Sequence, residues 1–354
     1  MRSLSNYLLL SLIKFLAIFA RKSSKPREHI LILSNTAMGD TIWASAALSY
    51  LHEFAPTTRV TIFTSKIGAH VLQNNPHVTE ILIDDKGIWH KLKNFYTIFT
   101  TPFSATFNFH STTRLIGYLG YLGSPGKYYG IAPECKVKSI LTAAINNPEY
   151  AKLHKVEMRI LLLARFLGLP SPTKRYFLAV YPEARHALAA KKLIKYQPEN
   201  KYVFLQVGAN RKERQWHPLY FKQLVAWLDA NGYICIFSGT PKEKALIAEI
   251  TEHTTHTIKL GPRASILELA SIIALCTFVV SNDTGPLHLA EALQKPMFCF
   301  FLEKNVVTSK PITANYLKLY ICNNDSADYI RIPTPEEVIQ DIRLTEKEYW
   351  HESA

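Results

Sequence analysis

The sequence has few acidic side chains for its size. Its 354 residues include 28 aspartates and glutamates against 41 lysines and arginines, which gives a net charge of +13 and a pI near 9.4. Such an excess favours anionic partners, namely nucleic acid, an acidic membrane surface or a phosphate-bearing substrate. The sequence contains no recognisable nucleic-acid-binding module, so we expect no nucleic-acid partner and keep the other two.

Cysteine is also scarce, and its pattern excludes a disulfide framework. The five cysteines include no C-x-x-C pair, and their number is odd. Cys235, Cys276 and Cys299 lie inside apolar runs, where a free thiol behaves as a small hydrophobic group. We therefore predict reduced core cysteines in a cytoplasmic protein.

The apolar run near the N-terminus is too short to cross a membrane. It extends from Tyr7 to Ala20, less than the ~20 residues that a spanning helix needs. Only Arg2 precedes it and the cleavage-site pattern is poor, which disfavours a secretory signal peptide. The basic residues that follow at once are Arg21, Lys22, Lys25 and Arg27. We predict that residues 1–27 form a helix in the interface of an anionic membrane, plus a basic segment; the alternative is a helix packed on the protein's own surface.

The rest of the chain has a globular composition, with 48% hydrophobic residues and a length that suits two domains. Buried-strand patterns alternate with helical patterns, which predicts an α/β fold of two Rossmann-like, doubly wound domains with parallel sheets. We place the domains at residues 28–180 and 181–334, and a C-terminal helix at 335–354. The predicted strands are His29–Ser34, Arg59–Thr64, Glu80–Asp84, Ala105–His110, Tyr202–Val207, Tyr233–Ser238, Thr257–Leu260, Phe278–Ser281 and Pro296–Phe301.

The stretch Ser281–Ala290 (SNDTGPLHLA) carries the strongest functional signal. It joins a predicted strand to a predicted helix, so it places backbone N–H groups at a positive helix end, where phosphate binds. Thr284 and Gly285 could supply these N–H groups, and Asp283 could orient a sugar hydroxyl. Asn35–Asp40 (NTAMGD) makes the same kind of turn in the first domain. Together they suggest one anionic ligand held between two domains.

Two further turns of the second domain offer polar groups for such a ligand. Gly208–Trp216 contains the amide of Asn210 and three cations, among them Arg214, close to a helix start. Ser238–Glu243 is a strand-to-helix turn in which Glu243 could accept hydrogen bonds from ribose hydroxyls. The structural alternative for Gly208–Trp216 is a solvated basic loop. For Glu243 it is an acidic residue that stabilises the first turn of a helix.

Gly39 and Asp40 are the candidate reactive pair. Gly39 would let the chain turn tightly and approach a substrate. Asp40 would then present a carboxylate at the mouth of the cleft, as a general base requires. The structural alternative is a helix N-cap, which stabilises a helix by about 1 kcal/mol. The two roles are compatible, because a cap fixes the position of the carboxylate.

These motifs, in this order and together with Gly261–Leu269 (GPRASILEL), resemble glycosyltransferase family 9, the heptosyltransferase type that builds the lipopolysaccharide inner core from ADP-heptose. The resemblance covers roughly residues 28–305. It implies a GT-B fold, with the acceptor bound mainly by the first domain and the ADP-sugar by the second. It also implies an inverting reaction and no obligatory metal or other cofactor.

The resemblance also implies roles for individual residues. Asp40 falls at the family's general base. Asn210, Arg214, Thr284 and Gly285 fall at positions that bind the donor diphosphate. The remaining donor positions are Glu243 for ribose, Ala264 for adenine and Asp283 for the donor sugar.

The acceptor side departs from the family pattern at two positions. Asn108 stands where many relatives have aspartate, and Lys127 stands where arginine is common. Arg114 and Lys127, with Gly39, are candidates for contacts with the carboxylates or phosphates of a lipopolysaccharide core or other lipid-linked acceptor, although surface charge also explains both cations. The resemblance implies a peripheral location at the cytoplasmic face of the inner membrane.

Three alternatives remain. The donor could be a different nucleotide sugar, because the sequence alone does not define the shape of the donor pocket. The chain could be a non-catalytic nucleotide-binding protein docked on a membrane, although Asp40 together with the basic loop argues against this. A dehydrogenase ranks last, because no G-x-G-x-x-G follows the first predicted strand.

Overall fold

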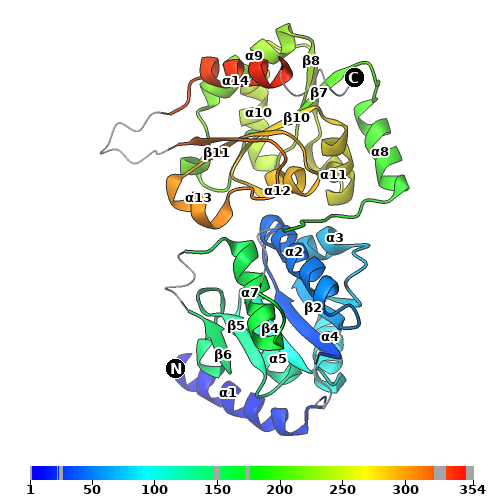
Figure 1. Cartoon of the computed structure of the whole chain (residues 1–354), viewed down its shortest axis with the longest axis vertical. Coiled ribbons are helices and arrows are strands. Elements are labelled where there is room, and N and C mark those ends of the chain that lie inside the picture. The colour runs from blue at the N-terminus through cyan, green and yellow to red at the C-terminus, as the bar shows by residue number, and fades with distance from the viewer. Residues whose placement is uncertain are drawn as a thin grey trace. The chain divides into compact units, whose positions relative to one another are not determined.

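The computed structural model describes residues 2–21, 23, 27–146, 152–171, 176–322 and 332–347, with side chains from residue 9 onward. The chain divides into two compact units, Met1–Tyr181 and Pro182–Ala354, which we call unit 1 and unit 2. In Figure 1, unit 1 runs from blue to green and unit 2 from green to red.

Unit 1 is built on a parallel six-stranded sheet with the order β3-β2-β1-β4-β5-β6. Its strands are β1 (His29–Ser34), β2 (Arg59–Ser65), β3 (Glu80–Asp84), β4 (Ala105–His110), β5 (Tyr128–Ile131) and β6 (Ala143–Ile145). Because the strands are parallel, their carboxyl ends share one edge of the sheet, the usual place for a ligand in such folds. We call it the carboxyl edge and the opposite one the amino edge.

Helices cover both faces of this sheet. The helices are α1 (Arg2–Phe19), α2 (Met38–Phe54), α3 (Lys66–Leu72), α4 (Ile88–Thr100), α5 (Arg114–Gly123) and α7 (Lys155–Leu167). α2 packs beside α3 and α7, whereas α5 packs between α1 and α4. The strand order explains this division of the helices into two sets. After β1 and β2 the chain moves toward the β3 end of the sheet, whereas after β3 and β4 it moves toward the β6 end. Because the crossovers are right-handed, this reversal places the helices of the two sets on opposite faces of the sheet.

The N-terminal helix is part of the unit 1 core. Ile13 and Ala17 of α1 are buried in the cluster that contains Leu31 of β1 and Val137. The opposite side of α1 is exposed and apolar, so the helix packs on its own domain and also presents an apolar face outward. Lys22 and Lys25 of the predicted basic segment lie outside the described residues.

No helix in the part of the chain that the structure describes is both long enough and apolar enough to cross a bilayer.

Unit 2 repeats the architecture with a parallel sheet of order β12-β11-β10-β7-β8-β9. Its strands are β7 (Lys201–Gln206), β8 (Tyr233–Phe237), β9 (Thr257–Lys259), β10 (Phe278–Asn282), β11 (Met297–Phe301) and β12 (Leu317–Ile321). Its helices are α8 (Ala184–Ile194), α9 (Pro218–Ala230), α10 (Lys244–Ile250), α11 (Ile266–Leu275), α12 (Gly285–Ala292), α13 (Glu303–Ser309) and α14 (Pro335–Thr345). The two helix-covered parallel sheets confirm the predicted α/β class.

The core of unit 2 is centred on Trp216, which is 1% exposed. Its ring stacks on Phe300 of β11 at 4.2 Å, and its indole nitrogen donates to the carbonyl of Pro333 at 2.8 Å. The C-terminal helix α14 packs on α9 within this unit. The part of the predicted C-terminal helix from residue 348 onward lies outside the described residues.

Candidate active site

Asp40 lies at the carboxyl edge of unit 1, in the first turn of α2. The helix begins at Met38 with Ala37 as its N-cap, so Asp40 is the third helical residue and the predicted N-cap position is wrong. The reason is that Ala37 already has the extended backbone of a cap, which starts the helix two residues earlier. Gly39 is helical and does not need a positive φ, so its predicted role in a tight turn is also wrong.

The Asp40 carboxylate is held by two cations of α7 and one hydroxyl. Arg159 Nη2 donates to Asp40 Oδ1 at 2.9 Å, and Lys155 Nζ lies 3.4 Å from the same oxygen. The hydroxyl of Thr36 donates to Oδ2 at 3.1 Å. Arg159 is only 1% exposed, whereas the carboxylate itself keeps 19% of its surface, so Asp40 remains accessible while its partner is not.

Trp43, one turn after Asp40 on α2, supports both cations. Lys155 Nζ lies 5.2 Å and Arg159 Cζ 5.9 Å from the centre of its ring, distances typical of cation–π contacts. His154, the N-cap of α7, meets the same ring edge-on at 5.4 Å. The geometry around Asp40 is therefore fixed from both helices.

The charges around Asp40 decide its protonation. Burial alone would raise the pKa of this carboxyl, but Arg159, then Lys155 and His110, outweigh burial and hold the pKa well below its usual range. Asp40 is therefore a carboxylate throughout the physiological range.

The structure separates the two cations predicted for the acceptor. Arg114 is the first residue of α5, is exposed, and follows β4 at the carboxyl edge, the edge to which Asp40 belongs. Lys127 is also exposed but immediately precedes β5, so it lies at the amino edge on the far side of the sheet. This placement argues against an acceptor contact by Lys127.

Asn108 is a core residue of β4 rather than an acceptor contact. It is fully buried, and its amide nitrogen donates to Tyr128 Oη at 2.7 Å and to Ser111 Oγ at 3.2 Å. The departure from the family pattern at this position therefore affects packing beneath the carboxyl edge. His110 and Glu134 share a hydrogen bond at the same edge, a contact that the sequence did not single out.

In unit 2, Arg214 and Asp283 come together from separate turns. Arg214 ends a short 3-10 turn (Lys212–Arg214) in the loop after β7, and Asp283 directly follows β10. Arg214 Nη1 lies 3.5 Å from Asp283 Oδ2, and the amide of Asn305 donates to the same oxygen at 2.9 Å. Two motifs that the sequence proposed independently thus form one cluster at the carboxyl edge of the second sheet.

Asn282 fixes the loop between β7 and α9. Its Oδ1 accepts the backbone N–H of Trp216 at 2.9 Å, and its Nδ2 donates to the carbonyl of Val207 at 2.8 Å. Both ends of the basic loop are thereby tied to the end of β10. Asn282 was not among the predicted site residues, although its place beside Asp283 in a polar strand-to-helix turn was a usable signal.

Thr284 and Gly285 form the N-terminus of α12. Thr284 is the N-cap with an extended backbone, its side chain makes no capping bond, and Gly285 is the first helical residue. Because the Thr284 side chain does not cap the helix, the backbone N–H groups at this N-terminus can bind an anion. His288, in the same helix, is buried and lies 3.1 Å from the buried carboxylate of Glu291, so it is a packing residue of unit 2.

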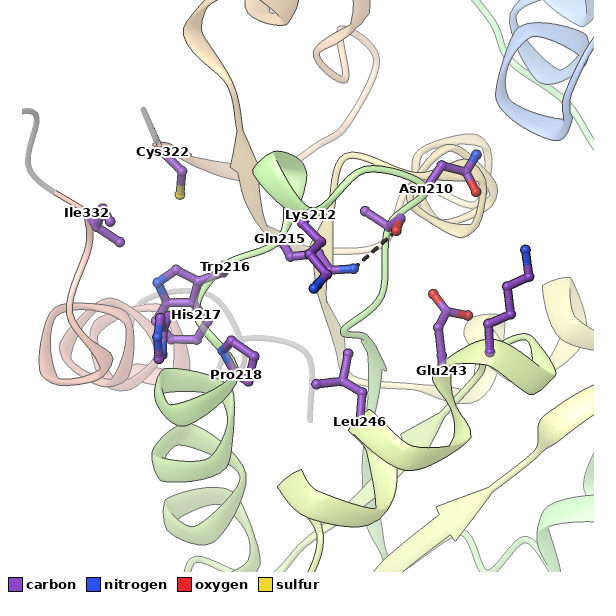
Figure 2. Close-up of a pocket in the computed structure, with 12 residues that line it drawn as sticks. Asn210, Lys212, Gln215, Trp216, His217, Pro218, Glu243, Leu246, Cys322 and Ile332 are labelled. Carbon is purple, nitrogen blue, oxygen red and sulfur yellow. Dashed lines mark hydrogen bonds between the residues drawn. The ribbon is translucent and has the colours of Figure 1, made fainter. Parts of the chain in front are cut away.

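A cavity of about 590 Å³ lies beside the same loop. Figure 2 shows Asn210 and Glu243 at one end of it, and Trp216, Cys322 and Ile332 at the other. Its lining residues are Ala209, Asn210, Lys212, Gln215, Trp216, His217, Pro218, Lys242, Glu243, Leu246, Cys322 and Ile332. The cavity thus brings together two of the predicted donor residues, Asn210 and Glu243.

Glu243 is positioned by a capping box. Its Oε2 accepts from the backbone nitrogen of Thr240 at 2.6 Å and from the Thr240 hydroxyl at 2.9 Å. Oε1 lies against Gly208, where a Cβ would come within 1.5 Å of it. A side chain at position 208 would therefore displace this carboxylate from its present position. The structural role expected of an acid in the first turn of a helix is present.

Ala264 lies outside this cavity. It follows the 3-10 turn Gly261–Arg263 beyond β9, is partly exposed, and belongs to the loop that leads into α11. Among the described residues, no group of three or more His, Cys, Asp or Glu side chains is placed to hold a metal ion.

Comparisons with known proteins agree on one family. Residues 126–337 match the profile of the family described as glycosyltransferase family 9 (heptosyltransferase). The chain is 22% identical over 300 residues to the lipopolysaccharide core heptosyltransferase OpsX of Haemophilus influenzae, a match that covers 80% of this chain and 82% of that protein.

Solved structures share the fold. The glycosyltransferase family 9 protein of Veillonella parvula superposes with a TM-score of 0.78 at 17% identity, over 92% of this chain and 99% of that one. The Escherichia coli ADP-heptose lipopolysaccharide heptosyltransferase II superposes with a TM-score of 0.73 at 17% identity, over 90% and 99%.

Proposed function

The chain belongs to glycosyltransferase family 9, and from this premise we propose that it transfers a heptose from ADP-heptose to a lipopolysaccharide core acceptor, with inversion at the anomeric carbon. The chain is a glycosyltransferase of α/β, GT-B class. The observation that carries the finer proposal is Asp40, a carboxylate kept ionised by Arg159 and Lys155 at the carboxyl edge of unit 1.

Asp40 acts as the general base. The acceptor hydroxyl oxygen forms a bond to the anomeric carbon while the bond from that carbon to the diphosphate oxygen breaks, and Asp40 takes the hydroxyl proton. The transition state has oxocarbenium character, as in inverting glycoside chemistry. A carboxylate of low pKa can serve here, because the hydroxyl becomes acidic late, when bond formation is advanced.

Unit 2 stabilises the departing ADP. The Arg214 side chain is 32% exposed, so its guanidinium can reach an anion while it stays near Asp283. The N-terminus of α12 at Thr284 and Gly285 adds backbone N–H groups and the positive helix end, and Asn210 adds an amide. Charge that grows on the diphosphate is stabilised by such preorganised donors.

The remaining donor contacts are proposed on the resemblance to the family. Glu243 binds the ribose hydroxyls from the wall of the cavity, and Ala264 contacts adenine from the loop before α11. Asp283 orients the donor sugar, held by Arg214 and Asn305. Arg114 and Gly39, which lie at the carboxyl edge of the sheet of unit 1, bind acidic groups of the acceptor. Lys127 lies at the amino edge, away from the proposed acceptor.

The acceptor is lipid-linked, so the protein works peripherally at the cytoplasmic face of the inner membrane. The net charge of +13 supports contact with an anionic surface.

The decisive experiment incubates the protein with ADP-heptose and a set of truncated lipopolysaccharide acceptors. Mass spectrometry should detect one added heptose on one acceptor, with release of ADP. A thermal-shift series with ADP, UDP, GDP and CMP tests the donor separately, since a bound ligand raises the melting temperature. Greater stabilisation by a nucleotide other than ADP would reassign the donor.

A further inference from the structure

Exposed apolar side chains of unit 1 gather on two helices that lie in one layer. On α4, Trp89 is 79% exposed, and Leu92 and Tyr96 follow at spacings of three and four residues, so the three share one side of the helix. On α1, Leu12, Phe15 and Phe19 have the same spacing and are also exposed. Ile88 of α4 and Ile18 of α1 extend the two stripes.

Both helices are firmly attached to the unit, so their outward faces are fixed surfaces. Ile98 of α4 is fully buried, and Asn94 donates to the carbonyl of Ile83 at 2.8 Å. The backbone nitrogen of Arg21, just after α1, donates to the carbonyl of Phe99 in α4 at 3.4 Å. α5 packs against both helices, which places all three on the same face of the sheet.

The charge of this layer has one sign. The sequences of α1, α4 and α5 contain no aspartate or glutamate. Lys14 of α1 and Lys91 and Lys93 of α4 are exposed there. The two acids that precede α4 are already engaged in other contacts, Asp84 with Asn35 at 2.6 Å and Asp85 with Lys66 at 2.9 Å.

This combination fits a lipid surface better than a protein partner. Tryptophan and tyrosine favour the membrane interface, where an apolar ring and a polar tip are both accommodated, and lysines beside them attract anionic headgroups. A symmetric dimer through the same face would bring equivalent surfaces together, with basic residues on both sides and no acid to pair with them.

We propose that the outward faces of α1 and α4 form one docking surface for an anionic lipid bilayer, with Trp89 inserted at the headgroup level. This surface extends the proposed function, because a lipid-linked acceptor lies in such a bilayer. α4 begins directly after β3, at the carboxyl edge of the sheet that carries Asp40. The docking surface therefore reaches the edge at which the acceptor reacts.

Sedimentation with vesicles tests the surface without any assay of activity. The full chain should bind vesicles of phosphatidylethanolamine and phosphatidylglycerol and bind pure phosphatidylcholine much more weakly.

Variants of α4 test which residues make the contact. The double variant Trp89→Glu with Leu92→Glu should abolish vesicle binding. The matched control is Leu188→Glu with Leu344→Glu, which changes two exposed leucines of unit 2; it has the same net charge and should leave vesicle binding unchanged. Lys91→Glu with Lys93→Glu should weaken binding at least about tenfold, since each basic residue near the surface contributes about fivefold; the matched control is Lys191→Glu with Lys192→Glu on α8.

Fluorescence places the contact at α4. Trp89 is exposed, whereas Trp43 and Trp216 are buried and Trp227 is partly buried. Trp350 lies outside the described residues, so the measurement uses a Trp350→Phe background. In that background a blue shift on addition of anionic vesicles should come from Trp89 and vanish when Trp89→Phe is added. Unchanged binding by the α4 variants, or equal loss in the unit 2 controls, would overturn the proposal. So would a parent protein that binds no vesicles, or a change from dimer to monomer in the α4 variants without any loss of vesicle binding. Transfer to a water-soluble truncated acceptor should persist in the α4 variants, which separates failure of docking from failure of the proposed reaction.

Discussion

Arg159 of α7 and Asp40 of α2 form an ion pair that is closed to solvent on one side and open on the other. Arg159 Nη2 lies 2.9 Å from Asp40 Oδ1, with side-chain exposures of 2% for the arginine and 19% for the aspartate. The guanidinium also donates to the carbonyl of Lys155 at 2.8 Å, which fixes its orientation within α7. A carboxylate held in this way is positioned before any substrate arrives.

Replacement of Asp40 should remove turnover and leave nucleotide binding intact. Asp40→Asn keeps the shape of the side chain but cannot take a proton, so kcat should fall by about 10²–10⁴-fold, the usual range for loss of a general base. The affinity for ADP, measured by calorimetry, should stay within about twofold, because the proposed nucleotide contacts all belong to unit 2. Near-normal turnover in a folded Asp40→Asn protein removes Asp40 from the role of base.

Replacement of Arg159 should change both stability and pH dependence. Arg159→Met leaves a largely buried carboxylate without its main partner, a change that costs on the order of 3–5 kcal/mol in buried pairs. Burial raises the pKa of Asp40, and in this variant less positive charge counteracts that effect. The pKa of Asp40 should therefore rise, and the acid limb of the kcat/KM profile should move to higher pH.

Linkage gives the sign of the matching effect on stability. The folded pKa of Asp40 is below its unfolded value, so its contribution to stability is present above pH ~4 and is lost as the pH falls toward the folded pKa. Arg159→Met should reduce this contribution at neutral pH. In a double-mutant cycle by urea unfolding, Asp40→Asn should recover part of the stability lost in Arg159→Met. A cycle with no coupling contradicts the ion pair.

His29 should make the protein less stable in mild acid. Burial, then the nearby Arg59, lowers the pKa of this imidazole to about 4, and Thr61 shares a hydrogen bond of 2.9 Å with it. The unfolded chain binds the proton at a pKa of about 6.5, so between pH ~6.5 and ~4 it holds more protons than the folded chain. Stability should therefore fall as the pH decreases through this window. His29→Gln, compared with the parent by urea unfolding at pH 7 and pH 5, should show a smaller fall.

The sequence was sufficient to locate the first four strands of unit 1. β1, β2, β3 and β4 lie within about one residue of the predicted strands, because each is a short apolar run bounded by polar turns. α4 and α5 were missed. Trp89 and Tyr96 of α4 and Leu115 of α5 are exposed although they are large and apolar, and α5 contains three glycines, which disfavour the prediction of a helix.

The site was predicted by residue type but not by pairing. Asp40 and Arg214 were recognised from their turns, whereas Arg159 and Lys155 were not, because they are 119 and 115 residues from Asp40 and lie in an ordinary helix. Lys127 was misplaced because a residue before a strand and a residue after one lie at opposite edges of a parallel sheet. Long-range contacts of this kind leave no signal in the spacing of a single sequence.

Gly208 should be sensitive to the smallest side chain. In Gly208→Ala the new Cβ would meet Glu243 Oε1 at 1.5 Å, so Glu243 must leave its position in the capping box with Thr240. ADP binding should weaken by about tenfold, which equals 1.4 kcal/mol, because the carboxylate no longer faces the ribose. Glu243→Gln should reproduce most of this loss. An unchanged dissociation constant by calorimetry in both variants would show that Glu243 does not contact the nucleotide.

Arg214 should show whether charge or shape matters at the diphosphate. Arg214→Lys keeps a cation near Asp283 and should retain ADP affinity within about tenfold, since lysine binds phosphate as a point charge. Arg214→Met removes the charge and should weaken ADP binding by more than about tenfold, with a reduced dependence of the affinity on salt concentration.

A control separates loss of the charge from disorder of the site. Arg214→Met leaves Asp283, which is 6% exposed, with Asn305 as its partner, so the site itself loses stability. Asp283→Asn in the Arg214→Met background removes that unpaired charge: it should restore thermal stability without restoring ADP affinity. If affinity returns with stability, Arg214 acts only by holding Asp283.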